Sequence, residues 1–203
     1  MKGFRYASGM AAQLPELLLP DAPAWRKWLA EHHAEPGVWL VLHKKGGTVT
    51  SLTYEEALDE ALCFGWVDGQ KGSRDGGSFR QRFTPRTSRS AWSARNVAHV
   101  ERLTVAGRMH LVGQAAVKAA KADGRWSHAY AGQADAAMPE DLAAAIAANP
   151  AAAMMLGRLN STNRYAMIYR VNAVKRSETR ARKIAQFVEM LARGETIYPQ
   201  QGS

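Results

Sequence analysis

Arginine is the residue type in this sequence that is best suited to bind a ligand. Five arginines follow one another within a short stretch, at Arg80, Arg82, Arg86, Arg89 and Arg95. The planar guanidinium group binds phosphate or carboxylate through two parallel hydrogen bonds and stacks on aromatic rings. The stretch therefore predicts a pocket for an anion, with Trp66 and Trp92 against the flat face of a base or sugar.

Neutral hydrogen-bond donors in the same stretch would complete such a pocket. They come from Ser90, Ser93 and Asn96, and from the first turn of the helix expected to follow. The backbone amides at the start of a helix have no partner within it and attract anions.

Asp68 is the candidate for acid or base chemistry. It follows a short apolar strand, where substrate-binding carboxylates are common, so an enzyme acting on a phosphorylated or carboxylated small molecule could use it as a base. Arg80, Arg82 and Arg86 would then act as electrostatic clamps. The simpler interpretation, which we favour, is that the Asp68 carboxylate caps the glycine-rich loop after it through an Asx turn.

A purely structural role for the arginines stays open. They could pair with the acidic face of the preceding helix, while the tryptophans fill the core. That face consists of Glu55, Glu56, Asp59 and Glu60. In this case no cation would remain for a ligand.

Three short segments are expected to form the sheet that positions these side chains. Val38 to His43 is a nearly continuous apolar run, and Trp66 to Asp68 is a short one. Phe79 to Phe83 alternates, which places Arg80 and Arg82 together on one face. Between the last two segments, 69–77 reads as a loop with four glycines.

Helices are expected to cover this sheet. Asp21 as N-cap with Pro23 in the first turn predicts a helix from Pro23 to His33. Thr53 and Glu56 form a capping box, which begins a helix that ends at Gly65. A further helix follows Ser93, and another spans about 112–122.

The second part of the chain is expected to consist of three or four helices. A linker from Ala131 to Met138 precedes them. In the last helix, apolar residues from Ala181 onward recur with helical spacing. Its other face carries a second basic group, Arg176, Arg180, Arg182 and Lys183. A solvated surface is the default interpretation of that group, and a nucleic-acid contact is the alternative.

The sequence therefore predicts an α+β protein, with a small N-terminal β-sheet covered by helices and a helical C-terminal subdomain. The expected division is an N-terminal extension at 1–20, an α+β subdomain at 21–130, the helical subdomain at 131–198 and a tail at 199–203. The order of the strands is not predicted.

Composition narrows the class of protein. With 203 residues, 46% of them hydrophobic and 22% charged, the chain has the composition of an ordinary globular protein. No apolar stretch reaches the length of a signal peptide or a membrane span, which predicts a cytoplasmic protein. The single cysteine, Cys63, excludes an internal disulfide. The histidines lack metal-ligand spacing and no cofactor motif is found, so neither a metal nor a cofactor is predicted.

The net charge of +9 is concentrated in two segments. The segment from Arg74 to Arg108 holds eight arginines, no lysine and two carboxylates. The segment from Arg164 to Arg193 holds six arginines and two lysines against two glutamates. Clustered positive charge attracts anions, so nucleic acid, a nucleotide and an acidic protein are all possible partners.

Several motifs together resemble the bacterial YdeI/OmpD-associated family, whose members are also labelled bacteriocin-protection proteins. They are LCFGWVDG at 62–69, RFTPR at 82–86, SAWS at 90–93 with Asn96, ERL at 101–103, GRM at 107–109, DGRW at 123–126 and ETRAR at 178–182. The likeness spans roughly residues 22–198, and Lys183 stands where a further arginine is expected. The resemblance implies a role in envelope stress and in tolerance of antimicrobial peptides, and it carries over no catalytic residue. The family is described as periplasmic, whereas this sequence lacks a signal and leads us to expect the cytoplasm.

Three functions are therefore compatible with the sequence. The first is a stress-tolerance protein, not an enzyme, that binds a nucleotide or nucleic acid through the arginines and tryptophans. The second is an enzyme with Asp68 as acid or base, and the third is a scaffold whose basic helices bind an acidic protein. The oligomeric state is not predicted.

Overall fold

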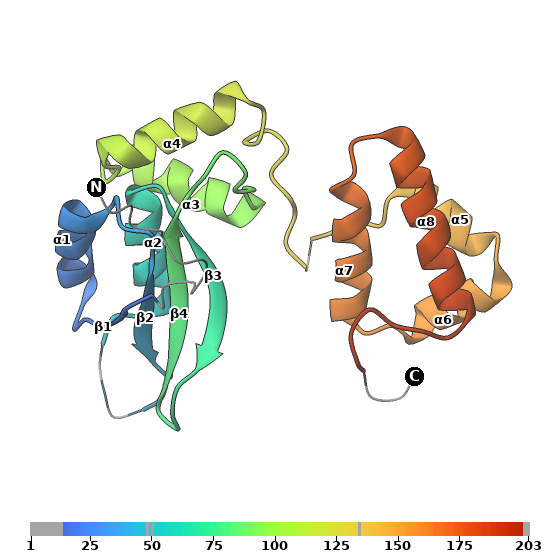
Figure 1. Ribbon diagram of the computed structural model, residues 1–203, viewed down its shortest axis with the longest axis horizontal. Coiled ribbons are helices and arrows are strands. Elements are labelled where there is room, and N and C mark those ends of the chain that lie inside the picture. Colours follow the sequence, from blue (N-terminus) through green and yellow to red (C-terminus); the bar gives the residue numbers. More distant parts are fainter. Residues whose placement is uncertain (1–13, 48, 50, 134, 201–203) are drawn as a thin grey trace, which may run out of the picture. The chain divides into compact units, whose positions relative to one another are not determined.

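The computed structural model describes residues 14–47, 49, 51–133 and 135–200. The chain divides into two compact units (Figure 1). The first, the N-terminal unit, comprises Met1–Trp92 and Asn96–Ala129, and the second, the C-terminal unit, comprises Ser93–Arg95 and Tyr130–Ser203. Each has its own hydrophobic core.

The strands and the helices up to the linker follow one another in a mixed order. They are β1 (Glu16–Leu18), α1 (Ala22–His32), β2 (Val38–His43), α2 (Tyr54–Cys63), β3 (Trp66–Ser73), β4 (Ser78–Pro85), α3 (Ala94–Val105) and α4 (Leu111–Ala122). The linker leads to α5 (Glu140–Ala147), α6 (Pro150–Arg158), α7 (Ser161–Asn172) and α8 (Ser177–Ala192). The predicted α+β fold with a helical C-terminal part is confirmed.

The sheet has four strands in the order β1-β2-β4-β3, so that β4 lies between β2 and β3 (Figure 1). β1 is parallel to β2, and the other pairs are antiparallel. Only three strands were predicted from the sequence. β1 was not among them, because it has only three residues, lies between Pro15 and Pro20 and does not alternate between apolar and polar side chains.

β3 is longer than expected. The segment from Gly69 to Ser73 continues the strand, and the connection to β4 is confined to 74–77. An irregularity between Asp68 and Lys71 shifts the register. There the buried Gln81 side chain donates hydrogen bonds to the Gly69 and Gln70 carbonyls, at 2.8 and 3.3 Å, which lets a glycine-rich segment stay paired.

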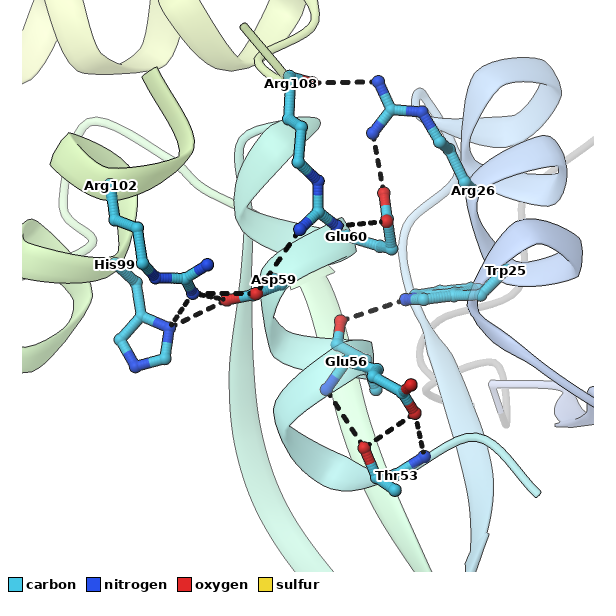
Figure 2. A network of polar contacts seen from close by, with 10 residues as sticks. Trp25, Arg26, Thr53, Glu56, Asp59, Glu60, His99, Arg102 and Arg108 are labelled. Atoms are coloured by element: carbon cyan, nitrogen blue, oxygen red, sulfur yellow. Dashed lines mark hydrogen bonds and ion pairs between the residues drawn. The ribbon is translucent and has the colours of Figure 1, made fainter. Parts of the chain in front are cut away.

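The inner face of the sheet forms the core of the N-terminal unit. Val38, Leu40 and Leu42 alternate onto this face. Trp25 and Leu58, from α1 and α2, belong to the same core. The indole nitrogen of Trp25 donates to the Ala57 carbonyl at 3.1 Å, which fixes α1 against α2 (Figure 2).

Local signals set the ends of the helices. The Asp21 carboxylate accepts a hydrogen bond from the Ala24 amide at 2.8 Å, as expected of an N-cap. Both hydrogen bonds of the Thr53 and Glu56 capping box are present (Figure 2). Gly65, just after α2, has a φ of +72°, which a side chain would disfavour.

The C-terminal unit holds α5 to α8 around a core that includes Leu142, Met167 and Leu191. Asn163 is 1% exposed and binds the chain after α8. Its Oδ1 accepts from the Tyr198 amide at 2.8 Å, and its Nδ2 donates to the Tyr198 carbonyl at 3.0 Å. None of the described helices combines the length and apolar character that crossing a bilayer requires.

Candidate ligand-binding site

The outer face of the sheet, which we define by Glu16, Leu18, Trp39, Arg80 and Arg82, is opposite the core. Strand register brings these residues together, because Glu16 pairs with Trp39 and Trp39 pairs with Arg82. The side chains of a cross-strand pair lie on the same face. Arg80 and Arg82 lie on one face of the sheet, and the indole of Trp39 lies on the same face. Trp39 was not among the predicted site residues.

Arg80 extends along the outer face toward β1. Its guanidinium carbon lies 4.9 Å from the centre of the Trp39 ring, and Nη1 donates to the Glu16 carboxylate at 2.7 Å. Gly72, its partner on β3, leaves room for the stem, since a Cβ there would come within 2.8 Å of the Arg80 Nε. Arg80 is therefore held in place and neutralised by a carboxylate.

Arg82 differs from Arg80 in having no such partner. Among the described residues, its guanidinium group forms neither a hydrogen bond nor an ion pair. Its stem lies near Gly69, where an added Cβ would be 3.8 Å from the Arg82 Cβ and Cδ. Its side chain is half-buried beside Trp39, so the charge of Arg82 is available to an anion.

Arg86 and Trp92 form a second group in the turn after β4. The Arg86 guanidinium carbon lies 3.6 Å from the centre of the Trp92 ring, and Nη1 donates to the Ala91 carbonyl at 2.9 Å. Trp92 is 2% exposed and packs on Trp126, with ring centres 4.9 Å apart. Trp92, which was predicted to hold a base or sugar, therefore carries the Arg86 guanidinium group on its ring, and this contact holds the turn closed.

Arg125 also holds this turn. Its guanidinium group donates to the Thr87 and Ser90 carbonyls at 3.3 and 3.0 Å, while Asp123 binds it at 2.7 Å. The Ser90 hydroxyl accepts from the Thr87 amide at 2.9 Å. Arg89, at the tip, is exposed.

The remaining residues of the predicted pocket belong to other parts of the fold. Ser93 and Arg95 belong to the C-terminal unit, where Ser93 bridges to Tyr130. Asn96 is 7% exposed, in α3. Trp66 is fully buried, with its indole nitrogen donating to the His33 carbonyl at 3.0 Å.

Asp68 lies on the inner face and accepts a hydrogen bond from the Tyr54 hydroxyl at 2.8 Å. It does not cap the glycine loop, because that segment is strand. The cap is Asp75 instead, whose Oδ1 accepts from the Gly77 and Ser78 amides at 2.8 and 2.6 Å. The Asx turn predicted for Asp68 thus occurs at another aspartate.

Two carboxylates of the acidic face of α2, Asp59 and Glu60, bind cations outside the predicted pocket. Glu60 is 5% exposed and accepts from Arg26 and Arg108 at 2.7 and 2.6 Å (Figure 2). Asp59 accepts from Arg102 at 2.7 Å and lies 2.8 Å from His99 (Figure 2). These carboxylates therefore do not neutralise Arg80 or Arg82.

Hydrogen bonds within this network favour the ionised form of Asp59. Burial alone would raise the pKa of Asp59, but hydrogen bonds from Arg102 and His99 outweigh it and hold that pKa below its ordinary value. Burial raises the pKa of the Cys63 thiol, which fits a small buried side chain. The network joins α1, α2 and α3, and we assign it a structural role.

The second basic group is only partly a free surface. Arg180 is bound at 2.6 and 2.9 Å by Asp141, and it donates to the Val171 carbonyl at 2.9 Å. Its hydrogen bond lowers the pKa of Asp141. Arg176 and Arg182 are exposed, while Lys183 lies near the Phe187 ring. Arg180 therefore joins α8 to α5.

Trp39 and Glu16 were not predicted as members of the site. Trp39 was hidden in an apolar run, although strand alternation places it on the face opposite Val38 and Leu40. Glu16 lay in what was taken as an extension. Its role depends on the parallel pairing of β1 with β2, for which the sequence carries no local signal.

Comparison with known proteins gave two family matches, one in each half of the chain. Residues 17–116 match a domain of unknown function, DUF8412. Residues 135–194 match the family described as "Bacteriocin-protection, YdeI or OmpD-Associated". The match to this second family is narrower than the resemblance seen in the sequence, whose first motifs fall within the DUF8412 match. Neither a search of curated proteins nor a search of solved structures gave a match. In its helical C-terminal unit the chain is thus similar, over residues 135–194, to the bacteriocin-protection, YdeI or OmpD-associated family.

Proposed function

We propose that the N-terminal unit binds single-stranded nucleic acid through the outer face of the sheet, as part of a cytoplasmic stress-tolerance protein of the bacteriocin-protection kind. The observation that carries this proposal is the guanidinium group of Arg82. It lies beside the indole of Trp39 and, within the described part of the chain, has no carboxylate to neutralise it.

Single-stranded nucleic acid fits this face better than an isolated small anion. Unpaired bases expose flat faces that stack on aromatic rings and on guanidinium planes, and the outer face offers both in Trp39 and Arg80. A phosphate that follows the stacked base would meet Arg82. A duplex hides its base faces and would use only the charge.

The experiment is a binding titration of a fluorescein-labelled thymidine decamer, followed by fluorescence anisotropy at salt concentrations from about 50 to 200 mM. Arg82→Ala is expected to weaken binding about tenfold and to reduce the slope of affinity against salt by about one unit. Trp39→Ala removes a stacking surface worth about 1–3 kcal/mol. It should leave the salt slope unchanged.

Lys27→Ala is the matched control. Lys27 is exposed on α1, on the side of the sheet opposite the proposed site, and this variant removes one positive charge as Arg82→Ala does. Equal losses for the two variants would mean that net charge alone attracts the oligonucleotide. The absence of binding by the wild type would refute the proposal.

A further inference from the structure

A groove of about 460 Å³ lies on the C-terminal unit. It is lined by Thr162, Tyr165, Ala166, Tyr169, Arg170 and Tyr198, and we call it the tyrosine groove. Five of these residues lie on one face of α7, and the sixth comes from the chain after α8. No part of the proposed function uses it.

One wall of the tyrosine groove is a fixed set of rings. The rings of Tyr165 and Tyr169 are 6.0 Å apart, and the ring of Tyr130 meets that of Tyr169 edge-on at 5.2 Å. The Tyr165 hydroxyl donates to the Ala131 carbonyl at 3.1 Å, which holds the ring in place. Tyr169 is nevertheless 39% exposed, so part of its ring surface is accessible to a ligand.

The opposite wall is Tyr198, which is 45% exposed. Its backbone is held by two hydrogen bonds to the buried Asn163, and the chain after α8 runs back to α7 to reach it (Figure 1). The Arg170 guanidinium carbon lies 5.7 Å from the Tyr198 ring centre, with Nη2 3.4 Å from the hydroxyl. Ala166, a small residue, also lines the groove.

We propose that the tyrosine groove binds an extended, proline-rich peptide segment that carries an acidic side chain. Proline-rich segments adopt the polyproline II conformation, whose rings fit between aromatic side chains and whose carbonyls have no internal partner. Hydroxyl groups of Tyr169, Tyr198 and Thr162 are available as donors to such carbonyls. Arg170 would bind the acidic side chain.

The charge of the tyrosine groove favours a peptide over a nucleic-acid strand. Arg170 is the single charged residue among those that line it. A nucleic-acid strand carries one phosphate per nucleotide, and one cation would leave most of these phosphates without a partner. One acidic residue in an otherwise neutral peptide matches one arginine.

The probe is a fluorescein-labelled peptide with four prolines on each side of one glutamate, titrated with the full chain and followed by anisotropy. Tyr169→Ala and Tyr198→Ala are each expected to weaken binding by about tenfold or more, because each removes a ring of one wall. Arg170→Gln should weaken binding of this peptide severalfold. It should leave unchanged the binding of a peptide with glutamine in place of the glutamate.

Arg182→Gln is the control, since Arg182 is exposed on α8 and does not line the tyrosine groove. Circular dichroism of each variant separates loss of binding from loss of folding. Three results would overturn the proposal. The first is no saturable binding up to about 1 mM peptide. The second is equal peptide binding by the Tyr169 variant and the wild type. The third is weaker binding of the thymidine decamer by the Tyr169 variant than by the wild type, which would place nucleic acid in the tyrosine groove.

Discussion

Arg80 and Arg82 are two residues apart on β4 and extend from the same face, yet their surroundings differ. Arg80 is bound by Glu16, and Arg82 has no carboxylate partner among the described residues. A carboxylate beside a binding site repels an anionic ligand and competes for the arginine. The affinity of this face for an anionic ligand should therefore depend on Glu16.

Glu16→Gln is expected to strengthen binding of the thymidine decamer by about threefold. The substitution removes a charge that repels the phosphates, and it releases Arg80 to bind them. The effect is small because exposed ion pairs contribute little free energy. Anisotropy titration measures the effect. Glu31→Gln, at an exposed position on α1, is the control for net charge. If both variants bind alike, Arg80 takes no part in the site.

Glu60 should matter for stability rather than binding. Glu60→Gln removes the anion that two arginines share in a buried position, and we expect it to lower the free energy of unfolding by roughly 2 kcal/mol. Urea denaturation followed by tryptophan fluorescence measures the change. Glu101→Gln, exposed on α3, should change it by less than about 0.5 kcal/mol. A similar midpoint for both variants would contradict the structural role of the network.

Asp59 should make the stability of the N-terminal unit depend on acid. Its pKa is lower in the folded chain than in the unfolded chain, where it is about 3.9. The stabilisation is therefore complete above that unfolded value and is lost as the pH falls through the lower folded value. Asp59→Asn should reduce the melting temperature at pH 7, and the difference from the wild type should shrink towards pH 2. A difference that does not vary with pH would refute this assignment.

Helices and strands could be predicted where neighbouring residues determine them. The caps at Asp21 and Thr53 and the apolar run of β2 all lie in neighbouring residues, and each element begins where these signals place it to within a residue. The continuation of β3 through Gly69 to Ser73 could not be predicted in this way. It depends on pairing with β4 and on the Gln81 side chain, which comes from another strand.

Gly113 in α4 provides a test of contact between elements. A Cβ at this position would overlap the Cys63 carbonyl oxygen at the end of α2. Gly113→Ala should therefore destabilise the N-terminal unit, although alanine favours a helix over glycine by about 1 kcal/mol. Gly157→Ala, in α6, meets nothing within 4 Å and should stabilise its own unit by up to about 1 kcal/mol. Thermal unfolding by circular dichroism distinguishes the two, and stabilisation by Gly113→Ala would contradict the close approach of α4 to α2.

At the scale of the whole molecule, the two cores predict two unfolding transitions. All six tryptophans belong to the N-terminal unit, at Trp25, Trp28, Trp39, Trp66, Trp92 and Trp126. Tryptophan fluorescence should therefore report that unit alone, whereas circular dichroism at 222 nm reports the helices of both. The urea transitions from the two probes are expected not to coincide. Superimposable curves would mean that the units unfold as one.

The fold could be predicted from sequence more completely than the site, and particular residues explain why. The α+β class follows from local periodicity. The partners of Glu60 come from α1 and from the segment after α3, and the partner of Arg80 comes from β1. Such pairings depend on tertiary contacts between distant residues, so the arginines that looked like one pocket are distributed between the outer face and a turn.

The binding of Tyr198 by Asn163 has a consequence for the C-terminal end of the chain. An exopeptidase that trimmed the chain back to Ile197 would remove Tyr198 from the tyrosine groove and, with it, the two hydrogen bonds that the buried Asn163 side chain forms with Tyr198. Tags fused directly after Gln200 could disturb the same contacts. Proteolytic removal of this end would thus irreversibly abolish ligand binding in the tyrosine groove.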